Sequence, residues 1–222
     1  MEQAKCILPD YGVLTGEQIE FINKNSHDIR HKEGEIIFMQ ERPVTHLIYV
    51  RSGLLKLYRE LEGGRQMILD IIPKDQFAGL TSIFYEALYP YSAASIIGGE
   101  LIHTSASAVR EVVSENGKYA LNLMTVLSSR VVYLVERMIA LTKKQVPGRI
   151  AEILLYFSKH IYKSNTFSLP LSRHEIADYV QTTKETVSRT LTEFRNDRII
   201  ELDDKDVVLK SLELLEILNK IG

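Results

Sequence analysis

At 222 residues, with 45% hydrophobic and 25% charged residues, the chain is long enough for two small globular domains or one large one, each with a core. No apolar run approaches the roughly 20 residues that span a bilayer, and the N-terminal MEQAKCILPD lacks the regions of a signal peptide, so we expect a cytoplasmic protein. One cysteine, Cys6, excludes an internal disulfide and a cysteine-ligated iron–sulfur cluster within one chain, and the net charge of −2 does not by itself indicate nucleic-acid binding.

The N-terminal half predicts a short helix followed by a β-rich domain. Residues Thr15 to Asn25 form the expected helix, with Thr15 as its cap and Ile19 and Ile22 on one face. From Ile29 to about Ser107, short β-rich runs alternate with glycine-containing turns, which is typical of a sandwich or barrel. The runs are EIIFMQ, HLIYVRS, LLKLYRE, QMILDII, AASII and ELIHTSA.

The stretch from 120 to 141 carries apolar residues at alternating spacings of four and three, the a/d pattern of a coiled coil. The seam consists of Ala120, Met124, Leu127, Val131, Leu134, Met138 and Leu141. A second apolar stripe consists of Leu121, Val132, Val135 and Ile139. We expect one stripe to pack on the chain's own β domain and the other on a second copy; the alternative is a core helix in a monomer. Pro147-Gly148 predicts the end of this helix and a hinge.

The C-terminal part predicts a winged helix-turn-helix. A helix from Arg149 to His160 comes first, and then LSRHEIADYVQTTKETVSRTLTEFRNDR, residues 171–198, predicts two short helices. Ser172 and Glu175 form a capping box for the first of them. Two apolar runs flanking Asp203-Asp204-Lys205-Asp206 predict a hairpin, and a last helix follows at 212–218. The alternative is an ordinary helical hairpin with a solvated face. Gln181 weakens the match to a helix-turn-helix, because such motifs often carry glycine in this turn.

KETVSRTLTEF, with the capped helix before it and the hairpin after it, resembles the recognition segment of the CRP/FNR family of bacterial transcription regulators. The spacing of Glu185, Ser188 and Arg189 is similar to that of the FNR branch, whereas CRP-like members carry glycine where Ser188 stands. KEGEIIF, Pro43, HLIYVRSGLLKLYR and GGRQMILDIIPKDQFAG resemble the family's β-roll. The resemblance implies an α+β chain with a cyclic-nucleotide-binding-type β-roll at 1–115, a dimerisation helix at 116–145 and a winged helix-turn-helix at 146–222.

The resemblance also implies a function and its residues. The chain would regulate transcription as a homodimer on an inverted repeat with TTGA-like half-sites, with RNA polymerase as a further partner. The implied DNA-contacting residues are Arg173, Thr182, Thr183, Lys184, Glu185, Thr186, Ser188 and Arg189. Arg189 suits a guanine and Glu185 the amino group of a cytosine. If Thr182 is the helix cap, however, Glu185 is the third helical residue and closes a capping box instead. The expected dimer interface is Met124, Leu127, Val131, Leu134, Met138 and Leu141.

The effector is left open by the sequence. Family members that bind cyclic AMP carry a Gly-Glu pair and an Arg-Ser or Arg-Thr pair; here Leu80 follows Gly79 in place of glutamate, and Tyr91 precedes Ser92 in place of arginine. A buried phosphate needs a charged or multi-donor partner, so we expect no cyclic AMP. The candidate effector pocket is Phe77, Gly79, Leu80, Tyr91, Ser92, Leu127 and Ser128. The remaining alternatives are a small apolar ligand, no ligand, haem held by His27, His31, His46, His103 or a methionine, and a redox switch at Cys6.

No catalytic arrangement is readable in the sequence. The histidines are scattered, without the His-x-His pair of a cupin metal site, and no Ser/His/Asp set or carboxylate pair stands out, so we expect neither an enzyme nor a resident metal. Besides an enzyme, the other alternative to a transcription regulator is a cyclic-nucleotide-type or haem sensor module that acts without direct DNA binding. The predicted winged helix argues against this alternative.

Overall fold

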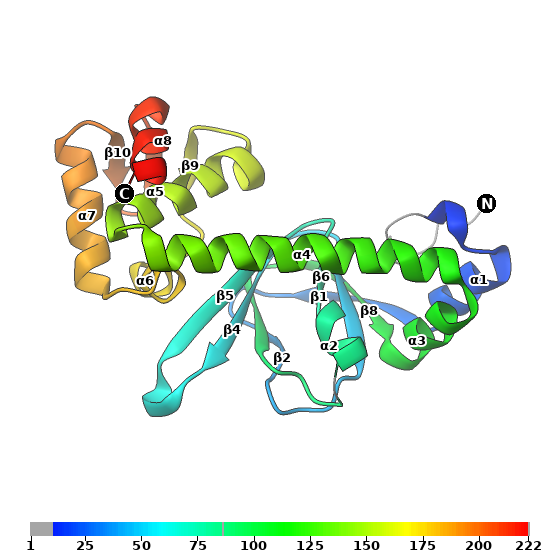
Figure 1. Ribbon diagram of the computed structural model, residues 1–222. Helices are drawn as coiled ribbons and strands as arrows, with labels where there is room; N and C mark the ends of the chain where they lie inside the picture. The colour runs from blue at the N-terminus through cyan, green and yellow to red at the C-terminus, as the bar shows by residue number, and fades with distance from the viewer. Residues whose placement is uncertain (1–10, 86, 222) are drawn as a thin grey trace. The chain divides into compact units, whose positions relative to one another are not determined.

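The computed structural model describes residues 11–85 and 87–221 (Figure 1). Cys6 lies outside them. The chain divides into two compact units, one ending at Val132 and the other beginning at Tyr133. The boundary therefore falls inside the long helix α4 (Gly117–Lys143). The sequence predicted the helix at 116–145, close to the bounds of α4, and a C-terminal domain from 146.

The N-terminal unit is built on two four-stranded antiparallel sheets (Figure 1). One sheet has the order β1-β8-β3-β6, with β1 (Ser26–His31), β8 (Gly99–Ser105), β3 (His46–Val50) and β6 (Phe77–Ala78). The other has the order β2-β7-β4-β5, with β2 (Ile36–Phe38), β7 (Ser92–Ile97), β4 (Leu54–Glu60) and β5 (Gln66–Pro73). Residues of both sheets, including Leu47, Leu55 and Ile72, are buried in one apolar core. The predicted β-roll is thus the observed architecture.

One glycine of this unit is required by a close backbone approach. A Cβ on Gly99 would lie 2.2 Å from the Ser52 carbonyl oxygen, which no side chain permits. The turn at Ser52 and the start of β8 can therefore pass each other only because Gly99 has no side chain.

Three helices accompany the roll. Helix α1 (Gly16–Lys24) begins at the predicted cap, Thr15, whose side chain accepts from the Gln18 N–H while Gln18 bonds back to the Thr15 N–H. Helices α2 (Leu80–Tyr85) and α3 (Ala106–Glu115) were not predicted. Short 3₁₀ turns lie at Tyr11–Val13 and Glu62–Gly64.

The first half of α4 packs on the roll through one face only. Tyr119 and Leu123 are buried, and Val126 and Leu127 pack partly buried against the same core. Arg130 adds an ion pair with Asp70, a buried carboxylate of β5 that also accepts from the Ile71 N–H. A buried charge is stable only when paired in this way, so the Asp70–Arg130 pair fixes α4 to the sheet at one register.

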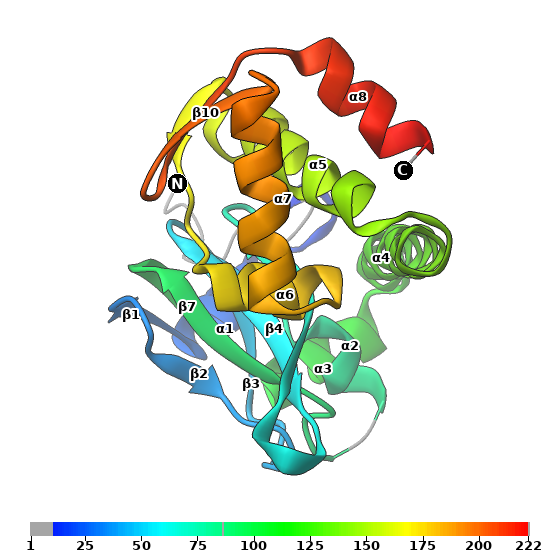
Figure 2. The ribbon, with the colours of Figure 1, turned by 90° about the vertical axis from the view of Figure 1, so that its left-hand side faces the viewer.

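The C-terminal unit holds the winged helix-turn-helix (Figure 2). It comprises α5 (Val146–Tyr156), a π-helical turn (Phe157–Tyr162), β9 (Thr166–Ser168), α6 (Arg173–Val180), α7 (Lys184–Asn196), β10 (Ile200–Asp203), β11 (Asp206–Leu209) and α8 (Leu212–Ile221). The predicted hairpin is β10–β11, and β9 pairs with β11 as a third strand. Helix α4 ends at Lys143, before Pro147, which lies instead in the first turn of α5, where a missing N–H costs nothing.

Within the described residues, no helix is long and apolar enough to cross a membrane.

Candidate nucleic-acid interface

Helix α6 begins as the sequence predicted. The Ser172 side chain accepts from the Glu175 N–H, and the Glu175 carboxylate accepts from the Ser172 N–H at 2.9 Å. The helix ends at Gln181, whose backbone is left-handed with φ of 54° and whose side-chain amide donates to the Asp178 carbonyl. Gln181 thus performs the turn for which glycine is usual, at the cost of some strain.

The start of α7 shows whether Glu185 closes a capping box. The cap is Thr183, whose hydroxyl accepts from the Thr186 N–H at 3.2 Å. Thr182 precedes the cap, so Glu185 is the second helical residue and the capping box considered from the sequence does not form. Within the described part of the chain its exposed carboxylate has no hydrogen-bond or ion-pair partner. Glu185 is therefore free to accept a hydrogen bond from outside.

Helix α7 divides cleanly into a buried and an outward face. Its buried residues are Val187, Thr190, Leu191 and Phe194. Lys184, Glu185 and Arg189 are exposed, and Ser188 and Thr186 are partly exposed. The Arg189 Nε lies 3.9 Å from a Glu193 carboxylate oxygen, a loose exposed pair that leaves most guanidinium donors available.

Arg173 is tied to the wing. Its guanidinium donates to the Asp204 carbonyl oxygen at 2.7 Å, linking the first turn of α6 to the β10–β11 turn. Burial lowers the pKa of Arg173, and Asp204 opposes that effect. The turn itself carries Asp203, Asp204 and Asp206, all exposed. The sequence identified Arg173 as a DNA-contacting candidate but gave no sign of this second role, because Asp204 is distant along the chain.

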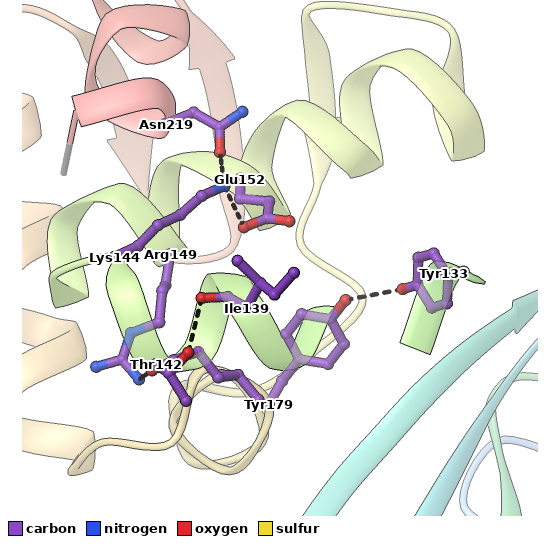
Figure 3. A network of polar contacts seen from close by, with 9 residues as sticks. Tyr133, Ile139, Thr142, Lys144, Arg149, Glu152, Tyr179 and Asn219 are labelled. Atoms are coloured by element: carbon purple, nitrogen blue, oxygen red, sulfur yellow. Dashed lines mark hydrogen bonds and ion pairs between the residues drawn. The ribbon is translucent and has the colours of Figure 1, made fainter. Parts of the chain in front are cut away.

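A polar network that the sequence did not predict joins the end of α4 to α5, α6 and α8 (Figure 3). The Tyr133 and Tyr179 hydroxyls lie 3.3 Å apart, and the Arg137 guanidinium stacks over the Tyr179 ring at 3.5 Å and donates to the Tyr179 carbonyl at 2.8 Å. Lys144 bonds Glu152 of α5 and Asn219 of α8. The last turns of α4 thus belong structurally to the helix-turn-helix unit.

Comparison with known proteins identifies both units. Residues 28–116 match the cyclic nucleotide-binding domain family, and residues 148–218 match the Crp-like helix-turn-helix domain family. The transcriptional activator protein FnrA of Stutzerimonas stutzeri is 29% identical over 188 residues, covering 82% of this chain and 77% of its own. A CRP-like cAMP-activated global transcriptional regulator of Mycobacterium tuberculosis is 27% identical over 217 residues, covering 94% and 96%.

The chain belongs to the CRP/FNR family. It is a DNA-binding transcription regulator, a class that is not enzymatic. Solved structures agree on the fold. FixK2 from Bradyrhizobium japonicum has a TM-score of 0.80 at 22% identity, covering 87% of this chain and 97% of its own. A putative crp/fnr-family regulator from Eubacterium rectale has a TM-score of 0.82 at 20% identity, covering 96% and 98%.

In this CRP/FNR chain, most of the candidate effector residues are buried or in contact with other residues of the N-terminal unit. Gly79 is buried with φ of +83°, Leu80 is buried at the start of α2, and Ser92 is buried and accepts from the Gln40 N–H at 2.9 Å. The Tyr91 hydroxyl bonds the Thr81 hydroxyl. Phe77 packs against the Tyr49 ring at 5.2 Å. Two other candidates lie on α4: Leu127 packs against the core and Ser128 is exposed.

The expected dimer seam is only partly exposed in the CRP/FNR chain. Met124, Val131, Leu134 and Met138 are 59%, 55%, 41% and 59% exposed, while Leu127 and Leu141 are half-buried. Leu127 packs on the chain's own core, because it lies next to the face that contains Leu123. The second stripe, by contrast, is exposed throughout, with Leu121 at 62% and Val132 at 58%. The outward apolar face therefore combines residues of both stripes.

Proposed function

We propose that this CRP/FNR regulator binds an inverted repeat with TTGA-like half-sites as a homodimer and places α7 of each copy in a major groove. The observation that carries the proposal is the outward face of α7, where Glu185, Ser188 and Arg189 stand together and Glu185 takes no part in a capping box. The α7 cap at Thr183 removes the capping box as a reason for a glutamate at this position, and in the first turn the carboxylate also suits the positive end of the helix.

The base contacts follow from hydrogen-bond chemistry. The Arg189 guanidinium can donate two bonds to the O6 and N7 of a guanine, and the Glu185 carboxylate can accept from the N4 of a cytosine. Ser188, small and beside them, can approach the outer thymine. Thr182, Thr183, Lys184 and Thr186, at the N-terminal end of α7, would contact phosphates, as would the guanidinium donors of Arg173 not used on the wing.

Two copies are required to cover an inverted repeat, and the outward apolar face of α4 supplies the surface. Eight large apolar side chains are exposed along it: Leu121, Met124, Val131, Val132, Leu134, Val135, Met138 and Ile139. A second copy of α4 would cover this face as a coiled coil. A regulator of this kind acts on chromosomal DNA in the cytoplasm and in contact with RNA polymerase.

We further propose that cyclic AMP is not the effector. The glutamate that anchors the ribose of cyclic AMP is replaced by Leu80, and the arginine that anchors its phosphate is replaced by Tyr91, whose hydroxyl is already bonded to Thr81. A small apolar ligand or haem stays open as the signal, as does the absence of any ligand. Titration calorimetry with cyclic AMP at physiological concentrations should show no binding.

Selection from random DNA tests the recognition proposal. The wild type should select TGA in inverted repeat. Glu185→Gln should keep the fold but relax the preference at one base pair, by roughly 1–3 kcal/mol per lost contact, and Arg189→Ala should remove the preference for guanine. Glu213→Gln, the same change at an exposed residue of α8, is the matched control and should leave the consensus unchanged. A wild-type consensus without TGA in inverted repeat would exclude these roles.

A further inference from the structure

Four of the chain's six histidines gather on one sheet of the N-terminal unit. His27 and His31 lie in β1, His46 in β3 and His103 in β8, the strand between them. His103 faces His27 across the β1–β8 pair. Its ring is stacked 5.3 Å from the His31 ring and meets the His46 ring edge-on at 5.8 Å.

The Nε2 atoms of the two central imidazoles lie within hydrogen-bond distance of each other. The distance between the Nε2 atoms of His31 and His103 is 3.2 Å. A neutral imidazole has one N–H and one lone pair, so a single proton can lie between these atoms as a hydrogen bond. Two nitrogens bound at about 2.0–2.1 Å to one tetrahedral ion lie about 3.3 Å apart, so the same spacing also fits a metal ion in place of the proton.

The third participant is Glu35, which orients the pair. The Glu35 Oε2 lies 3.2 Å from the His31 Nδ1 and accepts from the Lys32 N–H at 2.8 Å. A carboxylate on Nδ1 holds the proton there, so that the Nε2 lone pair of His31 faces His103. Metal-binding histidines are oriented by a carboxylate or carbonyl in the same way.

The environment keeps His103 in the form that binds metals. Burial, together with His31, His46 and His27, lowers the pKa of His103 to about 4. Its imidazole is therefore neutral at physiological pH, and only a neutral imidazole has a lone pair to donate.

We propose that His31 and His103 bind one divalent transition-metal ion of the zinc, nickel or copper class between their Nε2 atoms. Within residues 11–85 and 87–221, no group of three or more His, Cys, Asp or Glu side chains is placed to enclose a metal. Two imidazoles therefore supply the protein ligands and water supplies the rest. Such an open site holds its ion weakly and exchangeably, and it prefers these metals to magnesium or calcium because its ligands are imidazoles.

Calorimetric titration with Zn²⁺ tests the proposal on the tag-free full chain at neutral pH. The reference protein and every variant carry Cys6→Ser, which removes the only thiol of the chain. We expect one Zn²⁺ per chain with micromolar affinity, and no heat with Mg²⁺. His31→Gln and His103→Gln should each weaken binding at least about tenfold, and Glu35→Gln by about tenfold through lost orientation. His174→Gln, an exposed histidine on α6, is the control and should change nothing.

Thermal melting supplies a second readout. Saturating Zn²⁺ should raise the melting temperature of the wild type, because it binds only the folded chain, and should not raise that of His31→Gln. Since β1 is an edge strand, His31→Gln should fold even if the buried His103 variant does not. Absence of Zn²⁺ binding in the wild type, or full affinity in a folded His31→Gln variant, would overturn the proposal.

Discussion

Gln181 holds a backbone conformation that is unfavourable for any residue with a Cβ. In a helix interior glycine is less stable than alanine by roughly 1 kcal/mol. At Gln181 we expect the reverse order, with Gln181→Gly more stable than Gln181→Ala by about 1 kcal/mol, because both variants lose the side-chain bond to Asp178 and only alanine keeps the Cβ strain.

Urea unfolding of the two variants measures this difference. The matched pair is Thr192→Gly and Thr192→Ala, at an exposed position inside α7, where alanine should be the more stable. If alanine were also preferred at 181, the left-handed turn would not carry the strain assigned to it.

His103 makes the stability of the N-terminal unit depend on pH. Its pKa is about 4 in the fold, because of burial and the neighbouring histidines, and 6.5 without them. Between these values the unfolded chain binds the extra proton, so the free energy of unfolding should decrease as pH falls, by up to about 1.4 kcal/mol per pH unit.

Chemical denaturation across this pH range, with a chelator present, checks the slope. His103→Gln should flatten it, while His174→Gln, whose ring is exposed, should leave it as in the wild type. Equal slopes in the wild type and the His103 variant would contradict the assignment of the neutral form to His103.

At the scale of the element, the sequence revealed those strands and helices whose signals are local. The Ser172–Glu175 box and the Thr15 cap are within four residues of their partners, and both form. Strand β1, SHDIRH, was missed because it is largely polar, and β6 and β9 because they are short. The Arg173–Asp204 and His31–His103 contacts join residues far apart in the chain, so only the fold reveals them.

The wing carries an unfavourable pair of like charges, whose pairing across the hairpin was not predicted from the sequence. Asp203 and Asp206 lie directly opposite each other in the β10–β11 pair. Like charges in this arrangement destabilise a hairpin by roughly 0.2–1 kcal/mol, and a negative wing also repels nearby phosphates. Asp203→Asn should therefore raise both the melting temperature and the affinity for DNA, with the larger gain in affinity at low salt.

Scanning calorimetry and fluorescence anisotropy with one operator duplex measure the two effects of Asp203→Asn. Glu213→Gln removes one exposed carboxylate from α8 and controls for net charge. If the affinity of Asp203→Asn for DNA were unchanged, we would conclude that the wing does not lie near the phosphates.

At the scale of the whole molecule, α4 links the two units. The heptad pattern predicted this helix but not which of its faces packs on the β-roll. Periodicity gives two apolar stripes without saying which one the chain itself covers. The structure resolves this, since Tyr119, Leu123 and Arg130 face the roll while Leu121, Val131 and Val135 face outward. The unit boundary at Val132 was not predictable either, because Arg137 joins α4 to α6 through a residue far along the chain.

The outward face of α4 should be what holds two copies together. Val131 lies in the middle of this face and is 55% exposed in the single chain. Val131→Asp would bury two like charges in a parallel dimer, at a cost of several kcal/mol. We expect sedimentation to show a dimer for the wild type at micromolar concentration and a monomer for the variant, and the monomer should lose affinity for an inverted repeat while keeping its weak binding to a half-site.

Ser129→Asp separates this effect from added charge alone, because Ser129 is exposed on α4 but lies outside the apolar face. That control should remain dimeric and bind the inverted repeat as the wild type does. A wild type that is monomeric with and without DNA would mean that the exposed apolar side chains of α4 serve another partner, and that the inverted repeat is not bound through this helix.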